Sequence, residues 1–219
     1  MAQGFESIAT YYDCLVRITS GNLLYRNAIS LFSEIENASS VLVIGDGSGR
    51  ITEALLKHHS VEVIYYIELS PTLISKAEKR LNKLKEEHKL STRFHFLQQD
   101  IFESELPPTT FDLILTPYVL DLWGNEKLRA LIQLVSPCLK VEGSWYVSDF
   151  NPEIYHMRGM LGWLYRGLIR MLYQFFEWMV KLKTNKLPDI ETCFTNSSYS
   201  LQSKKVKAGG LLVSMVYKK

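Results

Sequence analysis

Hydrophobic residues in the first 150 positions alternate between short continuous runs and longer periodic stretches. The runs that have the length and β-branched or aromatic content of buried strands are 41–44, 61–69, 93–97, 111–116 and 143–150. The periodic stretches that predict helices are 50–58, 70–89 and 127–139. Strands that alternate with helices of this length predict right-handed crossovers and a mainly parallel sheet covered on both faces.

The helix at 70–89 has the clearest local signals. Ser70 supplies a hydroxyl N-cap and Pro71 occupies the first helical position, where its missing N–H costs nothing. The side chains expected on its buried face are Ile74, Ala77, Leu81 and Leu84.

The pattern changes after position 150. An apolar helical stretch at 154–183 precedes two alternating segments, 199–205 and 211–217, joined through Ala208-Gly209-Gly210. These segments predict a β-hairpin, so the sheet is expected to end in an antiparallel pair. We therefore expect one α/β domain with a doubly wound, mostly parallel seven-stranded sheet. Its expected parts are an N-terminal helical segment (1–36), a core (41–150), a helical cap (154–187) and the terminal hairpin (198–219).

Composition is that of an ordinary globular protein, with 47% hydrophobic and 22% charged residues. The net charge of +2 hides a split, because residues 1–150 carry 14 Lys/Arg against 19 Asp/Glu and residues 151–219 carry 11 against 4. A basic C-terminal third suggests an anionic ligand, membrane or nucleic acid there, or a basic face without a role.

The three cysteines, Cys14, Cys138 and Cys193, are odd in number and far apart. This spacing argues against a disulfide framework and a zinc site, and it predicts a reducing, cytoplasmic location with no metal. The N-terminus has no basic region followed by an apolar run, and no apolar run approaches the ~18–20 residues that span a bilayer.

The most informative segment is VLVIGDGSGR, residues 41–50. A buried strand runs into Gly45, Asp46, Gly47 and Gly49 and then into a helix. Glycines at alternate positions allow a tight turn with the backbone close to a ligand, and the helix start presents free amides. A glycine-rich turn without a ligand is the alternative.

Two acidic residues sharpen this interpretation. Glu68, followed by Leu69, ends the second strand, where a carboxylate can accept both hydroxyls of a ribose. Asp100 follows the third strand, where it can accept from an adenine amine beside the apolar Ile101. Either acid alone could be a solvated cap, but ligands of open α/β sheets bind at the carboxyl ends of the strands, where both lie.

Over residues 41–150 the chain resembles the class I S-adenosylmethionine-dependent methyltransferases. The resemblance implies a glycine loop at Gly45, Gly47 and Gly49, a ribose-binding acid at Glu68 and an adenine-side acid at Asp100. It further assigns the segment after the fourth strand to Thr116-Pro117-Tyr118, places a turn at 139–143 before strand five, and implies a terminal hairpin and S-adenosylmethionine as cofactor.

One position departs from the family pattern. The family usually carries Asp or Glu two residues before the first glycine, where this chain has Val43. The acid that helps hold the methionine end of the cofactor is then replaced by Asp46 or by a residue of the N-terminal segment.

A nicotinamide dinucleotide site is the competing interpretation. Its G-x-G-x-x-G pattern requires glycine at position 50, where Arg50 stands, and its two equivalent halves fit poorly with a terminal hairpin. We therefore expect methyl transfer to a small, lipophilic acceptor. The alternatives are a cofactor-binding protein without transfer activity and an NAD-dependent oxidoreductase.

The sequence identifies no catalytic residue. Candidate substrate-binding residues are Tyr11 and Tyr12 near the N-terminus, Asp121 after strand four and His156 after strand five. Each could instead have a purely structural role: packing for the tyrosines, helix capping for Asp121 and simple surface exposure for His156. Strand four is followed by Thr-Pro-Tyr and not Asn-Pro-Pro-Tyr, which disfavours amino methylation of DNA bases, and no nucleic-acid partner is expected.

The helical stretch 154–183 has one narrow polar stripe and is otherwise apolar. The stripe consists of Arg166, Arg170, Gln174, Glu177 and Lys181. Such a helix must be covered on more than one side. Three coverings are open: burial with a homodimer interface, a cap over an apolar acceptor, and peripheral membrane contact in which Trp163 and Trp178 take part.

Overall fold

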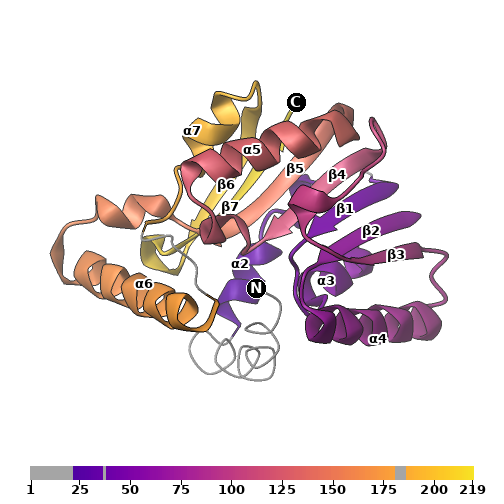
Figure 1. Cartoon of the computed structure of the whole chain (residues 1–219), viewed down its shortest axis with the longest axis horizontal. Coiled ribbons are helices and arrows are strands. Elements are labelled where there is room, and N and C mark those ends of the chain that lie inside the picture. Colours follow the sequence, from indigo (N-terminus) through magenta and orange to yellow (C-terminus); the bar gives the residue numbers. More distant parts are fainter. Residues whose placement is uncertain (1–21, 37, 181–185) are drawn as a thin grey trace.

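The computed structural model of the chain describes residues 22–36, 38–180 and 186–219, with only the backbone described at 171–180. A seven-stranded sheet forms its centre, in the order β3-β2-β1-β4-β5-β7-β6 (Figure 1). The strands are β1 (Ser40–Ile44), β2 (Val63–Glu68), β3 (Arg93–Gln98), β4 (Phe111–Pro117), β5 (Leu139–Phe150), β6 (Ser200–Lys207) and β7 (Leu212–Lys218).

Strands β1 to β5 pair in parallel, whereas β7 is antiparallel to both β5 and β6. The chain winds outward from β1 to β3 and then returns to place β4 on the other side of β1. The carboxyl ends of β1 and β4 therefore meet at the point where the winding direction reverses, which is where open α/β sheets bind ligands. The expected fold, including the terminal hairpin, is confirmed.

Helices cover both faces of the sheet. Figure 1 shows α5 and α7 on one face and α3 and α4 on the other, with α6 standing to one side. The helices are α2 (Leu23–Ala28), α3 (Arg50–His58), α4 (Pro71–His88), α5 (Asn125–Val135), α6 (Gly159–Val180) and α7 (Ile190–Thr195). Short 3-10 turns are η1 (Phe32–Glu34), η2 (Ile101–Glu103), η3 (Leu120–Leu122), η4 (Ser136–Cys138), η5 (Pro152–Tyr155) and η6 (Ala208–Gly210).

The core forms two layers because successive side chains of a strand point to opposite faces. In β1, Val41 and Val43 pack in the layer that contains α3 and α4, while Leu42 and Ile44 pack with α5 and α7. The predicted buried face of α4 is confirmed, since Ile74, Ala77, Leu81 and Leu84 are all buried. Its predicted cap is also confirmed: Ser70 Oγ accepts the amide of Leu73 at 3.3 Å.

Two predicted boundaries are wrong. The helix expected at 127–139 ends at Val135, because Pro137 cannot donate a helical hydrogen bond and the chain turns through η4 into β5. Carbonyls of Pro137 and Cys138 accept the amides of Thr109 and Thr110, which draws this segment to the sheet. The turn expected at 139–143 is consequently the start of β5, with an irregular register against β4.

The helix expected at 154–183 is divided. Residues Pro152–Tyr155 form η5, which Asn151 caps by accepting the amide of Glu153, and α6 begins only at Gly159. Residues 181–183 lie outside the described part of the chain. The short helix α7 has no counterpart among the predicted elements.

Candidate functional site

The glycine loop joins the carboxyl end of β1 to α3. Gly45, Gly47 and Gly49 have φ angles of 72°, 59° and 76°, in the left-handed region that favours glycine. A Cβ at Gly45 would lie 2.6 Å from Val119 Cγ2, and one at Gly49 would lie 3.2 Å from Ala77 Cα. At Gly47 the nearest atom would be Leu73 Cδ1, at 3.9 Å. Gly45 and Gly49 therefore let the loop pack closely against Val119 and Ala77, whereas protein atoms leave room beside Gly47.

Side chains of strand β2 hold both backbone polar groups of Gly47. The Gly47 amide donates to Oε2 of Glu68 at 3.1 Å, and the Gly47 carbonyl accepts the hydroxyl of Tyr66 at 3.0 Å. The other carboxylate oxygen of Glu68 accepts the amide of Ser70 at 2.9 Å. Burial raises the pKa of Glu68, against the hydrogen bonds from these amides. A buried carboxylate thus lies between the loop and the start of α4.

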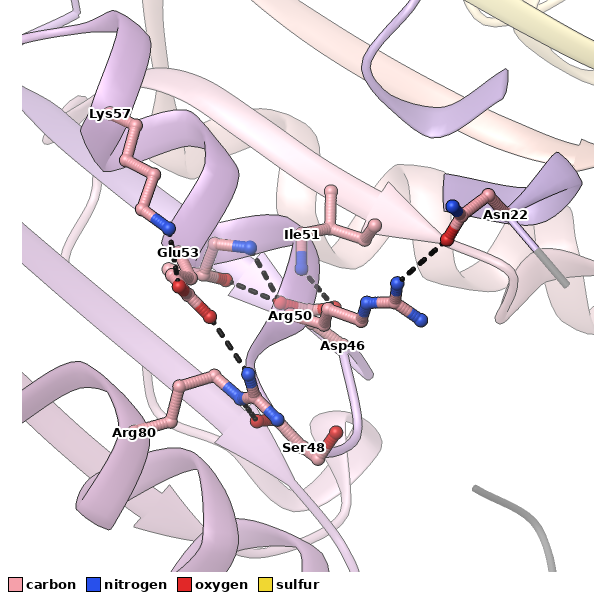
Figure 2. Close-up of polar contacts among 9 residues, drawn as sticks. Asn22, Asp46, Ser48, Arg50, Ile51, Glu53, Lys57 and Arg80 are labelled. Atoms are coloured by element: carbon pink, nitrogen blue, oxygen red, sulfur yellow. Dashed lines mark hydrogen bonds and ion pairs between the residues drawn. The ribbon is translucent and has the colours of Figure 1, made fainter. Parts of the chain in front are cut away.

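The Asp46 carboxylate accepts hydrogen bonds from the first turn of α3. Its Oδ2 accepts the amide and the hydroxyl of Thr52, each at 2.7 Å, and Oδ1 accepts the amide of Ile51 at 3.2 Å (Figure 2). Burial raises the pKa of Asp46 to about 6, although the bonds from Thr52 and Ile51 oppose that rise. The carboxylate of Asp46 thus satisfies free amides at a helix start. That Asp46 replaces the acid missing at Val43 stays a prediction. Residues 1–21 of the N-terminal segment, the alternative source of that acid, lie outside the described part.

A second set of contacts ties the loop to its neighbours. Arg80 of α4 donates to the carbonyl of Ser48 at 2.9 Å and forms an ion pair with Glu53 of α3 at 2.8 Å (Figure 2). Burial alone would raise the pKa of Glu53, but hydrogen bonds from Lys57 and Arg80 hold it below its ordinary value. Sequence reasoning missed Tyr66 and Arg80, because one belongs to a strand pattern and the other to a basic helix surface.

Arg50 connects the loop to the N-terminal segment. Its guanidinium donates to Asn22 Oδ1 at 3.3 Å (Figure 2). It also lies 4.9 Å from the centre of the Tyr25 ring. The residue that disfavours a dinucleotide fingerprint therefore positions α2 beside the loop.

The adenine-side residues are partly as expected. Asp100 is half-buried after β3 and caps η2, with Oδ1 accepting the amide of Phe102 at 3.1 Å. Ile101 packs into the core, with 4% of its surface exposed, and its role as an adenine wall stays a prediction. The next residue, Phe102, is half-buried. Its ring packs edge-on against Trp123, with the two ring centres 5.5 Å apart.

The two residues predicted after β4 have different surroundings. Thr116 is fully buried, and its hydroxyl accepts from Trp145 Nε1 at 3.1 Å and donates to the Tyr146 carbonyl at 3.3 Å. Its contact with the cofactor stays a prediction. Tyr118 has a left-handed φ of 53°. Its hydroxyl donates to the carbonyl of Leu24 at 2.7 Å and accepts from Asn27 at 3.1 Å, which fastens α2 to this edge of the sheet.

Two buried carboxyl groups lie after β4 and at the end of β5. Asp149 is fully buried and accepts the amides of Leu120 and Asp121 through Oδ2 and that of Phe150 through Oδ1. Burial, and then the neighbouring Asp121, raise the pKa of Asp149 well above its ordinary value, and burial also raises that of Asp121. The pair therefore retains a proton more readily than surface carboxyls do.

The remaining candidates are less informative. His156 is exposed directly after η5, which fits a surface residue without a binding role. Leu69 is half-buried after β2. Tyr11 and Tyr12 lie outside the described residues. Within the described part of the chain, no three His, Cys, Asp or Glu side chains gather in a way that could hold a metal ion.

Comparison with known proteins agrees with this geometry. A family model described as a methyltransferase domain matches residues 41–143. The malonyl-[acyl-carrier protein] O-methyltransferase of Paenibacillus sp. (strain JDR-2) is 31% identical over 133 residues, which are 55% of this chain and 46% of that protein. The chain therefore spans about half the length of this curated relative.

Solved structures support the fold. The N-methyltransferase NodS of Bradyrhizobium japonicum WM9, in complex with S-adenosyl-L-homocysteine, aligns with a TM-score of 0.58 at 17% identity, over 89% of this chain and 82% of its own. A chain from the complex of the Haloferax volcanii Trm112 methyltransferase activator with a putative methyltransferase aligns with a TM-score of 0.69 at 12% identity, over 99% and 96%. The resemblance inferred from the glycine loop and the strand-end acids is confirmed.

Proposed function

We propose that this chain, whose core is a class I S-adenosylmethionine-dependent methyltransferase domain, transfers a methyl group from S-adenosylmethionine to a small lipophilic acceptor. The observation that carries the proposal is the Gly47 peptide, held between Glu68 and Tyr66 at the carboxyl edge of the parallel sheet. The room beside Gly47 and the buried carboxylate next to it fit a ligand that carries a ribose.

The residues proposed to hold the cofactor are those of the loop and the strand ends: Gly45, Gly47, Gly49, Glu68, Leu69 and Asp100. Glu68 would accept the ribose hydroxyls, and Asp100 would accept from the adenine amine. When bound, the cofactor supplies a methyl group already activated by a sulfonium centre. The chain must then orient an acceptor in line with that group and exclude water.

The buried acids at η3 and β5 suggest how the acceptor side is shaped. Asp149 fixes the amides of Leu120 and Asp121, so it sets the conformation of the turn that follows β4. An acceptor that is protonated at neutral pH needs a base, and Asp121 is the proposed candidate because its carboxyl lies at this edge with a raised pKa.

A lipophilic acceptor is supported by the apolar surroundings of the segment after β5. Ile154 of η5 is buried against Ile169 of α6 and Leu187, and Met157 and Tyr165 pack around them. The curated relative is named for malonyl-[acyl-carrier protein], so acyl carboxylates belong in the panel of acceptors to be tested.

Binding and turnover test the proposal separately. S-adenosylhomocysteine at about 100 times its Kd should stabilise the protein by about 2.7 kcal/mol in a thermal shift experiment, and NAD should not. A shift with NAD alone would contradict the proposal. Transfer of radiolabel from S-[methyl-³H]adenosylmethionine into an organic extract, across lipophilic carboxylates, phenols and amines, then tests catalysis. Binding without turnover favours a cofactor-binding protein, the candidate that Val43 motivates.

Location and partners are also part of the proposal. The described cysteines, Cys138 and Cys193, are both free and buried, which supports a cytoplasmic protein. No helix in the described part of the chain is long and apolar enough to cross a membrane. The unpartnered face of α6 leaves a second copy of the chain or a membrane surface as a macromolecular partner.

A further inference from the structure

Helix α6 exposes a cluster of large apolar side chains. Met160, Leu161, Trp163 and Leu164 are 79%, 44%, 68% and 48% exposed. The other exposed large apolar residues described are distributed over four elements: α2, α5, β5 and β6. Figure 1 shows α6 to one side of the sheet, away from α3 and α4. We call the surface formed by these four side chains the outer face of α6.

The opposite face of α6 is fixed, so the outer face has a defined direction. A Cβ at Gly162 would lie 2.4 Å from the Met157 carbonyl oxygen, which shows how closely the helix approaches η5. Tyr165 donates its hydroxyl to the Ala208 carbonyl at 2.7 Å, and Ile169 is buried. Arg166 donates to the carbonyls of Ile154 and Met157. Rotating the helix to bury the outer face would break these contacts.

The exposed charged residues next to the four side chains of the outer face are basic. No Asp or Glu occurs from position 154 to 176, while Arg158 and Arg170 are both exposed. Arg170 stands seven residues after Trp163, two helical turns along the same side.

We propose that the outer face of α6 docks on an anionic lipid surface. Trp163, Leu164 and Met160 would enter the boundary between headgroups and acyl chains, and Arg158 and Arg170 would lie at the level of the phosphates. An interfacial helix of this kind combines an apolar face with basic flanks and Trp.

A second copy of the chain fits this surface less well. Two copies related by a twofold axis present the same face to each other. Arg158 and Arg170 would then approach their own counterparts, and the one acidic residue of α6, Glu177, comes only in the last turn of the helix. Lipid phosphates supply the negative charge that this face lacks.

Docking in this way would turn one end of the site toward the bilayer. Segment η5 leads directly from the carboxyl end of β5 to α6, so it joins the edge that carries Asp149 to the docking helix. The inference does not depend on the proposed methyl transfer, because lipid binding and cofactor binding are measured separately.

Vesicle flotation with the full-length protein tests the proposal. We expect the protein to float with phosphatidylcholine vesicles that contain phosphatidylglycerol, to float poorly with pure phosphatidylcholine, and to dissociate as salt is raised. Trp163→Glu/Leu164→Glu should lower the partition coefficient at least about tenfold. The matched control is Val141→Glu, because Val141 is 81% exposed on β5, and it should float like the wild type. An unchanged circular dichroism spectrum and thermal unfolding midpoint in both variants would show that the fold is intact.

Three results would overturn the proposal. The first is a wild-type protein that floats with neither kind of vesicle. The second is a Trp163→Glu/Leu164→Glu variant that partitions as well as the Val141→Glu control. The third is light scattering that shows a dimer which this double variant converts to a monomer, because the outer face would then belong to a second copy of the chain.

Discussion

Oε2 of Glu68 lies 3.1 Å from the backbone nitrogen of Gly47 and accepts its hydrogen bond. The contact joins the end of β2 to the middle of the loop that follows β1, 21 positions earlier in the chain. Since Oε1 accepts the amide of Ser70, one carboxylate positions both the glycine loop and the start of α4. A carboxylate has about four lone-pair sites, so Glu68 can hold these amides and still accept from a ribose.

We predict that Glu68→Ala raises the Kd for S-adenosylhomocysteine at least tenfold. The variant loses hydrogen bonds to a charged acceptor, each typically worth about 1.5–3 kcal/mol, and about 1.4 kcal/mol corresponds to a factor of ten. Isothermal titration calorimetry measures the effect, with Glu62→Ala as the control because Glu62 is exposed just before β2. An unchanged Kd in a folded Glu68→Ala protein would show that the ribose site is wrongly placed.

The three loop glycines should respond differently to alanine. Gly45→Ala should lower the stability most, because the new Cβ would lie 2.6 Å from Val119 Cγ2. Gly49→Ala should have the next largest effect, because its Cβ would lie 3.2 Å from Ala77 Cα, a backbone atom that cannot move aside easily. Gly47→Ala should lower the stability only by the penalty for a left-handed residue with a Cβ, about 1–2 kcal/mol. Of the three variants, it should weaken cofactor binding most for a given loss of stability. Urea unfolding and calorimetry on each variant separate the two effects. Equal stability losses at Gly45 and Gly47 would contradict the assignment.

Asp46 should make stability fall as pH rises through the weakly acidic range. Burial raises its pKa in the folded protein from 3.8 to about 6, so the folded state binds a proton that the unfolded state has released. This contribution is fully present below about pH 4 and is lost as pH passes 6, and it amounts to no more than about 3 kcal/mol. Asp46→Asn removes the titration. The difference in free energy of unfolding between wild type and Asp46→Asn should therefore decline from pH 4 to pH 7, and parallel profiles would refute this.

Removing the Asp149 carboxylate should destabilise the protein strongly. Asp149→Ala leaves the amides of Leu120, Asp121 and Phe150 without their acceptor, at about 1–3 kcal/mol for each buried group. Asp149→Asn keeps one acceptor oxygen and should lose less. The matched control is Asp189→Ala, where an exposed carboxylate caps α7 and the expected cost is about 0.5–2 kcal/mol. Chemical denaturation that gives equal losses for Asp149→Ala and Asp189→Ala would contradict this role.

Much of the candidate site could be read from the sequence because its signals are local. Alternate glycines after a buried run required left-handed turns, and acids at strand ends were placed on one edge by the parallel topology. What a side chain does at that edge was less predictable. Asp46 and Thr116 have partners that the sequence did not indicate, the amides of α3 and the indole of Trp145.

The sequence by itself determined the succession of the seven strands along the chain, the capped start of α4 and the terminal hairpin. Each of these depends on hydrophobic period and on the backbone preferences of Ser, Pro and Gly within a few residues. Only the tertiary structure decided which groups meet across long separations: Tyr118 with Leu24, Arg80 with Ser48, and Asp149 with the amides of η3. The tertiary structure also decided where α5 ends and which face of α6 remains exposed to solvent. These outcomes follow from competition between distant partners for the same polar groups and the same buried space, and no local pattern records that competition.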